Sequence, residues 1–328
     1  MTRLLTTLLF TLTLVACGDS GGPAVSTVVQ APVKGTSAPA QQLERKRIAL
    51  VMKTLTNPFF VEMEKGARRA EIELGVELQV KTAAQETSIE QQIQIVEDMI
   101  AAKVDAIVIA PGDSQRLVPV LKKAVDGGIK VVNLDNRLDP EAVKQAGFAP
   151  VPFISVDNEK GAYGAAKFMA DTVNKPTEAA ILEGIRSADN ARQRMMGAKR
   201  AFAENKDIKL VSSESANWKI DEGYTVTQQI FAKNPNVKLV FAANDMMGLG
   251  ALKFLQKTGK TDVKVGAYDA LTDAVAEVKA GRLMVTVDQQ AAEQGFQGIA
   301  LAIRLLKGEV VPEITLIDTQ LVTSKSVK

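Results

Sequence analysis

The chain of 328 residues contains no histidine and a single cysteine, Cys17. Without histidine it lacks the commonest general base and the commonest metal ligand. One cysteine excludes a disulfide within the chain and a cysteine-ligated zinc site. Nucleophilic sites built on a serine–histidine or cysteine–histidine pair are therefore impossible. Carboxylate or lysine catalysis survives these exclusions, but no nucleophile–base pair is visible, so we expect no enzyme activity, no metal and no cofactor.

The chain also lacks the glycine-rich loops of nucleotide-binding proteins and a large net charge. Neither a G-x-G-x-x-G sequence nor a complete G-x-x-x-x-G-K-[ST] loop occurs, since Gly259-Lys260-Thr261 has Phe254 where that loop needs its first glycine. The formal net charge is +2, and the one short basic run is Arg45-Lys46-Arg47. This pattern gives no electrostatic footprint for nucleic acid. With 46% hydrophobic and 24% charged residues, the composition is that of a globular protein long enough for two domains.

The N-terminal segment resembles a bacterial signal peptide. A positive start precedes an apolar run over 4–15, which is shorter than the roughly 20 residues of an ordinary membrane-spanning helix. Leu14-Val15-Ala16-Cys17 resembles a lipobox, where the chain is cut before the cysteine and the thiol is acylated. The alternative is a plain signal peptide with an incidental cysteine. We expect a signal peptide at 1–16, then a lipidated Cys17 and a flexible tether over 17–45.

Such a protein is exported and contacts the membrane only through its lipid, on the outer side of the cytoplasmic membrane. Several acyl chains make this kind of anchoring stable without a spanning helix.

Beyond residue 46, short apolar runs alternate regularly with amphipathic segments. Asn57-Pro58 is typical of a helix cap followed by proline, and Ser88 with Gln91 is typical of a capping box. The apolar runs predict strands at 47–52, 76–80, 105–110, 130–134, 152–156, 178–182, 208–212, 237–241, 263–267 and 283–287. The amphipathic segments predict helices at 58–74, 88–102, 114–127, 158–174, 190–205, 222–233, 245–258, 271–280 and 291–307.

This alternation predicts an α/β fold with right-handed crossovers and parallel sheets covered on both faces. Ten strands reach the limit of what one twisted open sheet usually carries, so two doubly wound lobes are expected. In such sheets ligands bind beyond the carboxyl ends of the strands. The residues that follow the strands are therefore the candidate ligand-binding residues.

Polar and aromatic side chains stand at these positions. Carboxylate, amide and guanidinium groups pair with neighbouring hydroxyls, and aromatic rings offer a flat apolar surface to the C–H face of a sugar. The charges balance, with Lys53 and Arg192 against Asp135 and Asp269, which favours a neutral polyhydroxylated ligand over an anion. The predicted ligand-binding residues are Lys53, Asn57, Phe59, Phe60, Asp135, Asn136, Arg192, Trp218, Asn244, Asp269 and Gln289.

Each of these residues also has an ordinary structural interpretation. An Asp or Asn after a strand is commonly a helix cap or turn residue, and Asp113-Ser114 and Asp245 are interpreted as such caps and left out of the site. The phenylalanine pair can belong to the core, Lys53 can be a solvated amine, and Trp218 can pack between lobes. The prediction rests on several polar groups that all follow strand ends.

Five segments, in register between about 48 and 322, resemble landmarks of the ribose-binding-protein branch of the periplasmic binding proteins. They are Asn57-Pro58-Phe59-Phe60, Pro111-Gly112-Asp113-Ser114, Ala191-Arg192-Gln193-Arg194, Phe241-Ala242-Ala243-Asn244-Asp245 and Gly266-Ala267-Tyr268-Asp269. The resemblance implies the type I fold, in which two lobes joined by three crossover strands close on a ligand. The implied N-terminal lobe is 46–156 with 290–319, and the C-terminal lobe is 157–289 with 320–328.

By this resemblance, Asp135 hydrogen-bonds sugar hydroxyls and Trp218 keeps a stacking role. Two positions differ from ribose binders. Lys53 stands where they carry a small hydroxyl residue, as in arabinose- and fructose-binding relatives, and Asn136 replaces an arginine. These differences favour another pentose, a ketohexose such as fructose, or a related polyol.

The function that follows is an extracytoplasmic solute-binding lipoprotein, a monomer that delivers a neutral sugar or polyol to ABC permease subunits. Two alternatives keep the same two-lobed binding fold. In one the protein senses its ligand for a chemoreceptor or sensor kinase, and in the other it binds a non-sugar signal such as a furanone. A LacI-type repressor shares the fold, but it needs an N-terminal helix-turn-helix where this chain carries an export signal.

Overall fold

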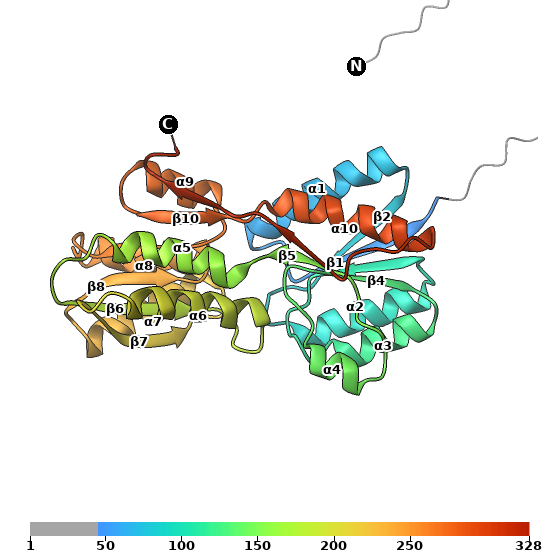
Figure 1. The fold of residues 1–328 in the computed structure, drawn as a ribbon, viewed down its shortest axis with the longest axis horizontal. Helices are drawn as coiled ribbons and strands as arrows, with labels where there is room; N and C mark the ends of the chain where they lie inside the picture. The colour runs from blue at the N-terminus through green and yellow to red at the C-terminus, as the bar shows by residue number, and fades with distance from the viewer. Residues whose placement is uncertain (1–44, 328) are drawn as a thin grey trace, which may run out of the picture. The chain divides into compact units, whose positions relative to one another are not determined.

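The computed structural model describes residues 45–327 of the chain. The predicted signal peptide at 1–16, the predicted lipidation at Cys17 and all but the last residue of the tether lie outside them. Among the described residues, no helix is both long and apolar enough to cross a bilayer. These residues form a single unit that contains two six-stranded sheets (Figure 1).

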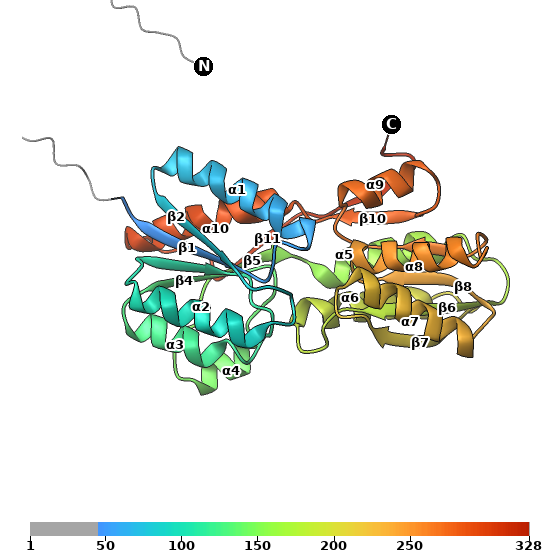
Figure 2. The same ribbon diagram turned by 180° about the vertical axis from the view of Figure 1, so that it is seen from behind.

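The first sheet is parallel throughout, with strand order β11-β5-β4-β3-β1-β2. From Ile48 to Met52 strand β1 is fully buried, as expected for a parallel sheet covered on both faces. Helices α1 and α10 pack together on one face, and α2 and α3 on the other (Figures 1 and 2). The strands are β1 (Arg47–Met52), β2 (Glu77–Thr82), β3 (Ala106–Ile109), β4 (Lys130–Leu134), β5 (Phe153–Val156) and β11 (Ile314–Ile317). The helices are α1 (Pro58–Leu74), α2 (Ile89–Ala101), α3 (Val118–Asp126), α4 (Pro140–Gln145) and α10 (Ala291–Leu306).

The second sheet has the order β12-β10-β9-β8-β6-β7, and only β12 runs antiparallel to its neighbour. Helices α5 and α6 pair against it, as do α7 and α8. The strands are β6 (Thr177–Glu183), β7 (Ile208–Ser215), β8 (Val237–Ala242), β9 (Lys264–Gly266), β10 (Val285–Asp288) and β12 (Gln320–Thr323). The helices are α5 (Asn158–Ala170), α6 (Asp189–Ala203), α7 (Ile220–Lys233), α8 (Asp245–Lys257) and α9 (Thr272–Lys279).

The chain passes from one sheet to the other three times. It crosses between β5 and α5, between β10 and α10, and between β11 and β12 (Figure 1). The predicted α/β class, with two doubly wound lobes joined by three crossovers, is confirmed. Each lobe thus turns the carboxyl ends of its parallel strands, and the loops after them, towards the other lobe.

Glycine allows α1 and α10 to approach closely in the first lobe. A Cβ on Gly66 of α1 would lie 1.7 Å from the carbonyl oxygen of Ala292, and one on Gly295 of α10 would lie 2.0 Å from that of Met63. No side chain fits at either position. This contact fixes α1, whose first turn carries the phenylalanine pair, against the rest of the lobe.

Some local predictions are wrong. Helix α4 was not predicted. Strands β11 and β12 were not predicted either, because they are short edge strands with exposed side chains such as Leu316. The capping box is absent: Ser88 makes no side-chain cap, and Gln91 Oε1 accepts from the amide of Ala84 instead. Asp245 is no cap either, since Asn244 caps α8 and Asp245 is fully buried one residue later.

Candidate functional site

A narrow cavity lies between the lobes, among the loops that follow the strands. Residues from both lobes and from a crossover segment line it, and most carry polar side chains. Those that line it are Lys53, Asn57, Phe59, Phe60, Glu86, Asp135, Asn190, Arg194, Trp218, Asn244, Asp269 and Gln289. All the predicted ligand-binding residues except Asn136 and Arg192 are among them.

Lys53 and Asp135 form a buried ion pair on the first-lobe side. Lys53 follows β1 and Asp135 follows β4, and because β3 alone separates these strands their ends lie close together. Lys53 Nζ is 2.7 Å from Asp135 Oδ2, and each side chain is only 3% exposed. A buried ion pair needs further hydrogen bonds to offset its desolvation. Ligand hydroxyls can supply them from the cavity side.

Asn57 and Glu86 form a second polar pair in this lobe. Asn57 Oδ1 caps α1 by accepting from the amide of Phe59 at 3.1 Å, while its Nδ2 donates to Glu86 Oε1 at 2.8 Å. Glu86 is almost fully buried. Burial raises the pKa of Glu86, and the nearby Lys53 ammonium opposes that shift.

Phe59 and Phe60 supply the apolar wall. Their rings meet edge to face, with centroids 5.1 Å apart, and both are buried. The ammonium of Lys53 lies 5.5 Å from the Phe60 ring centroid, within the range of a cation–π contact. One ring pair therefore serves both the core of the lobe and the cavity.

Arg194 is the central cation of the second-lobe side. Its guanidinium donates to the carbonyl oxygen of Ala243 at 3.0 Å, to Asp269 Oδ1 at 3.2 Å and to Gln289 Oε1 at 3.2 Å. It also lies 3.9 Å from the ring centroid of Tyr268. These contacts use most of its fork of donors and hold the planar group in one orientation.

Asp269 is held by that guanidinium and by the amide of Gln289. Gln289 Nε2 donates to Asp269 Oδ1 at 2.6 Å. Burial raises the pKa of Asp269 to about 7, against the opposing effect of the Arg194 charge. Asp269 Oδ2 takes no part in these two bonds, which leaves it for a ligand hydroxyl.

Trp218 and Asn244 complete this wall. Trp218 has a left-handed backbone with φ of 67°, and its carbonyl oxygen accepts from Asn244 Nδ2 at 3.2 Å. Asn244 Oδ1 caps α8 by accepting from the amide of Met247 at 2.9 Å. A Cβ on Gly184 would lie 2.1 Å from the indole ring, so glycine is needed there for the ring to sit in the cavity wall.

Two buried polar atoms of the cavity wall have no hydrogen-bond partner among the described residues: Asn190 Oδ1 and Trp218 Nε1. Leaving a buried polar group unpaired costs about 1–3 kcal/mol. An acceptor and a donor are thus available to a ligand that carries hydroxyl groups.

Arg192 and Asn136 lie elsewhere. Arg192 pairs with Asp189 at 3.2 Å, and its side chain is 43% exposed. Two residues along a helix are separated by about 200°, so Arg194 points to the cavity and Arg192 away from it. Asn136 is fully buried behind the cavity, where its Nδ2 donates to the carbonyl oxygen of Pro111 at 2.9 Å.

Three cavity residues were not predicted from the sequence: Glu86, Asn190 and Arg194. Glu86 stands in the loop after β2, so the rule that selected the other residues also applies to it. Asn190 and Arg194 are four residues apart on α6, which places both on one face of that helix.

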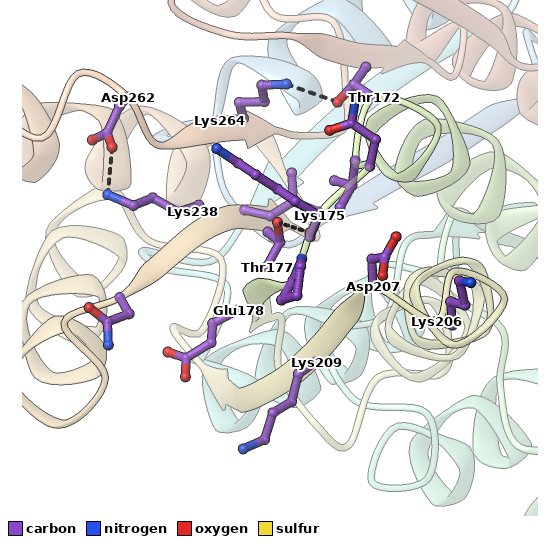
Figure 3. Close-up of a pocket in the computed structure, with 15 residues that line it drawn as sticks. Thr172, Lys175, Thr177, Glu178, Lys206, Asp207, Lys209, Lys238, Asp262 and Lys264 are labelled. Atoms are coloured by element: carbon purple, nitrogen blue, oxygen red, sulfur yellow. Dashed lines mark hydrogen bonds and ion pairs between the residues drawn. The ribbon is translucent and has the colours of Figure 1, made fainter.

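A larger hollow lies at the opposite end of the second lobe (Figure 3). Lysine side chains surround it at the amino ends of the strands, including Lys238 and Lys264. Lys238 pairs with Asp262, and Lys264 donates to the hydroxyl of Thr172 (Figure 3). This hollow is exposed and lies away from the carboxyl ends where ligands of doubly wound sheets bind.

The chain matches the periplasmic binding protein domain over residues 48–310. It is 43% identical over 273 residues to the D-ribose/D-allose-binding protein of Pseudomonas aeruginosa, covering 82% of this chain and 85% of that protein. It is 34% identical over 283 residues to the D-allose-binding periplasmic protein of Escherichia coli, covering 84% of this chain and 91% of that protein.

A solved structure gives the same result. An ABC transporter periplasmic solute-binding protein from Actinobacillus succinogenes with bound D-allose superimposes with a TM-score of 0.82 at 39% identity, covering 86% of this chain and 99% of that one. The predicted resemblance to the ribose-binding type and the type I architecture are confirmed.

Proposed function

This chain belongs to the periplasmic binding protein domain family, and from that premise we propose that it captures a monosaccharide and delivers it to an ABC importer. The observation that carries the proposal is the interlobe cavity, where polar groups of both lobes converge and two buried polar atoms lack partners. The closing bodies are residues 46–156 with 290–319 and residues 157–289 with 320–328.

The cavity favours a neutral sugar with several hydroxyl groups. Lys53 and Arg194 provide two cations, and Asp135, Asp269 and Glu86 provide three carboxyl groups. An anion would meet more carboxylates than cations. A sugar instead donates hydroxyl protons to carboxylates and accepts from the amine and guanidinium, and such charged hydrogen bonds are roughly twice as strong as neutral ones.

We favour an aldose of the ribose or allose kind. Two relatives more than 30% identical carry D-allose in their names, one of them with D-ribose, and the structural neighbour from Actinobacillus succinogenes holds D-allose. The sugars named for these relatives are stronger support for an aldose than Lys53 was, from the sequence alone, for a ketohexose.

The remaining parts of the proposal concern the setting of the protein. It acts by binding alone, without catalysis, as a monomer that presents its closed form to permease subunits. Cys17, acylated after removal of residues 1–16, holds it on the outer side of the cytoplasmic membrane. Both lobes contribute to the surface of the closed form, so a permease or a sensor that contacts both detects occupancy.

Thermal unfolding with a panel of sugars tests the proposal. The full chain carrying Cys17→Ser, which prevents acylation, is unfolded and refolded to remove carried-over ligand. A ligand at 100 times its dissociation constant stabilises the fold by about 2.7 kcal/mol, a shift of several degrees. D-allose or D-ribose should give this shift, and Asp135→Asn should abolish it, whereas exposed Asp126→Asn should not. If only an amino acid, a nucleoside or an anion shifts the midpoint, the assignment of a sugar is wrong.

A further inference from the structure

Helix α6 begins without a side-chain cap from its own lobe. Its N-cap residue is Ala188, whose backbone is extended, with φ −91° and ψ 132°. That conformation is normal for an N-cap, but the methyl group of alanine accepts no hydrogen bond. The first amides of α6 therefore need acceptors from another part of the chain.

Those acceptors come from the other lobe. The amide of Asp189 donates to Ser114 Oγ at 3.0 Å, and the amide of Asn190 donates to Asn136 Oδ1 at 3.2 Å. The backbone adds a third bond, from the amide of Ser114 to the carbonyl oxygen of Ser187 at 3.3 Å. Ser114 follows β3 and Asn136 follows β4, both in the first lobe.

Hydrogen bonds within the first lobe hold both acceptor residues, and the amide of Asp139 donates to the carbonyl oxygen of Ser114 at 2.8 Å. Ser114 and Asn136 are both buried. Asn136 Nδ2 donates to the carbonyl oxygen of Pro111 at 2.9 Å, and Asn133 Nδ2 donates to the carbonyl oxygen of Asn136 at 2.8 Å. All these partners belong to the first lobe, so the first lobe presents a fixed pair of acceptors to the helix.

We propose that Ser114 and Asn136 cap helix α6 across the lobe interface and so stabilise the closed form without touching the ligand. When the lobes part, the amides of Asp189 and Asn190 lose these acceptors. The inference rests on the proposed function in one respect: the closed form is the one that holds sugar. Asn136 was predicted from the sequence as a ligand contact. In this proposal it holds the second lobe in the closed position instead, through its hydrogen bond to α6.

The cap also connects closure to the cavity. Asn190, the second residue of α6, and Arg194, one turn later, both line the cavity. Asn190 Nδ2 lies 3.4 Å from both carboxylate oxygens of Asp135, again across the interface. Fixing the first turn of α6 therefore places one amide and one guanidinium against the ligand.

Ser114→Ala tests the proposal, because it removes the acceptor for Asp189 and leaves the backbone bond to Ser187. Ser88→Ala, in the same lobe and without a cap bond, is the matched control. Calorimetry of the full chain with Cys17→Ser should show about fivefold weaker D-allose or D-ribose binding for Ser114→Ala, the effect of losing one N-cap. The Ser88→Ala affinity should equal that of the parent chain.

Amide hydrogen exchange, followed with and without saturating sugar, supplies a second readout. Exchange at Asp189 should be faster in Ser114→Ala than in the parent chain, and unchanged in Ser88→Ala. If sugar binds the parent chain but neither affinity nor exchange differs in Ser114→Ala, the cap across lobes is wrong. If no sugar binds the parent chain, the proposed function is wrong, and faster exchange at Asp189 in Ser114→Ala than in the parent chain still supports the cap.

A second variant adds an acceptor where the helix lacks one. Ala188→Ser gives α6 a cap within its own lobe, and this cap persists when the lobes open. It should raise the unfolding midpoint of the ligand-free chain and at the same time weaken sugar binding severalfold. A rise in both midpoint and affinity would show that the native capping contributes nothing to closure and would overturn the proposal.

Discussion

Arg194 Nη1 lies 3.2 Å from Asp269 Oδ1, and both side chains are only 3% exposed. The two residues come from different post-strand segments of the second lobe, since α6 follows β6 and Asp269 follows β9. The pair joins a helix to a loop inside the cavity wall. Removing one partner of such a pair leaves a buried charge without compensation.

Arg194→Leu should destabilise the fold by about 3–5 kcal/mol, because Asp269 then loses its buried counter-charge. It should also abolish sugar binding. Arg192→Leu is the control from the same helix: its exposed ion pair with Asp189 is of the kind worth about 0–1 kcal/mol. Urea unfolding and calorimetry of both variants check this, and equal losses would show that Arg194 has no special role.

The raised pKa of Asp269, about 7, predicts a pH dependence of stability. An unfolded aspartate titrates near pH 4, so between about pH 4 and pH 7 the ligand-free folded chain binds more protons than the unfolded chain. Its free energy of unfolding should therefore fall as the pH rises through this window. Burial raises the pKa of Glu86 and Asp245 as well, which adds to the same trend.

Asp269→Asn should flatten this dependence, because the amide does not titrate. The free energy of unfolding, measured by urea titration at pH 5 and pH 7.5 without sugar, should differ less between the two pH values than in the parent chain. Exposed Asp126→Asn should keep the parent's slope. An unchanged slope in Asp269→Asn would contradict the raised pKa.

The strand rhythm and the rule that ligands bind at carboxyl ends predicted the two lobes and most of the cavity wall. They did not show which of Arg192 and Arg194 faces the cavity, because that depends on how the helix is rotated about its axis against the sheet. Had Asn190 been chosen, the spacing of four residues would have pointed to Arg194. The place of Asn136 outside the cavity wall could not be read from the sequence for a similar reason. Asp135 has a left-handed φ of 58°, so two consecutive residues turn in different directions.

Glu86→Gln should weaken sugar binding about five- to tenfold, because it replaces a charged acceptor by a neutral one of the same shape. The bond from Asn57 to Oε1 can persist in the variant, so stability should change little. Calorimetry against Glu90→Gln, a substitution in an exposed pair with Arg116, checks the effect. Equal affinity in both variants would mean that Glu86 does not contact the sugar.

Trp218, the only tryptophan in the chain, should report ligand by its fluorescence. Its indole is buried in the cavity wall, and its Nε1 lacks a partner among the described residues. Sugar that contacts this ring or bonds to Nε1 changes its surroundings, so the emission should shift in proportion to occupancy. Titration with D-allose or D-ribose should give the dissociation constant found by calorimetry, and no emission change at saturation would contradict the contact.

Gly184→Ala tests the same contact from behind the ring. Its new Cβ would meet the indole at 2.1 Å, whereas a Cβ on Gly164 of α5 would be 3.8 Å from its nearest neighbour, Leu321. Gly184→Ala must therefore push the indole into the cavity, which should alter the ligand-free emission and weaken binding by at least tenfold. Gly164→Ala should leave both unchanged, because 3.8 Å is an ordinary contact. If the two variants behave alike, the ring does not form the cavity wall, and stacking on sugar loses its basis.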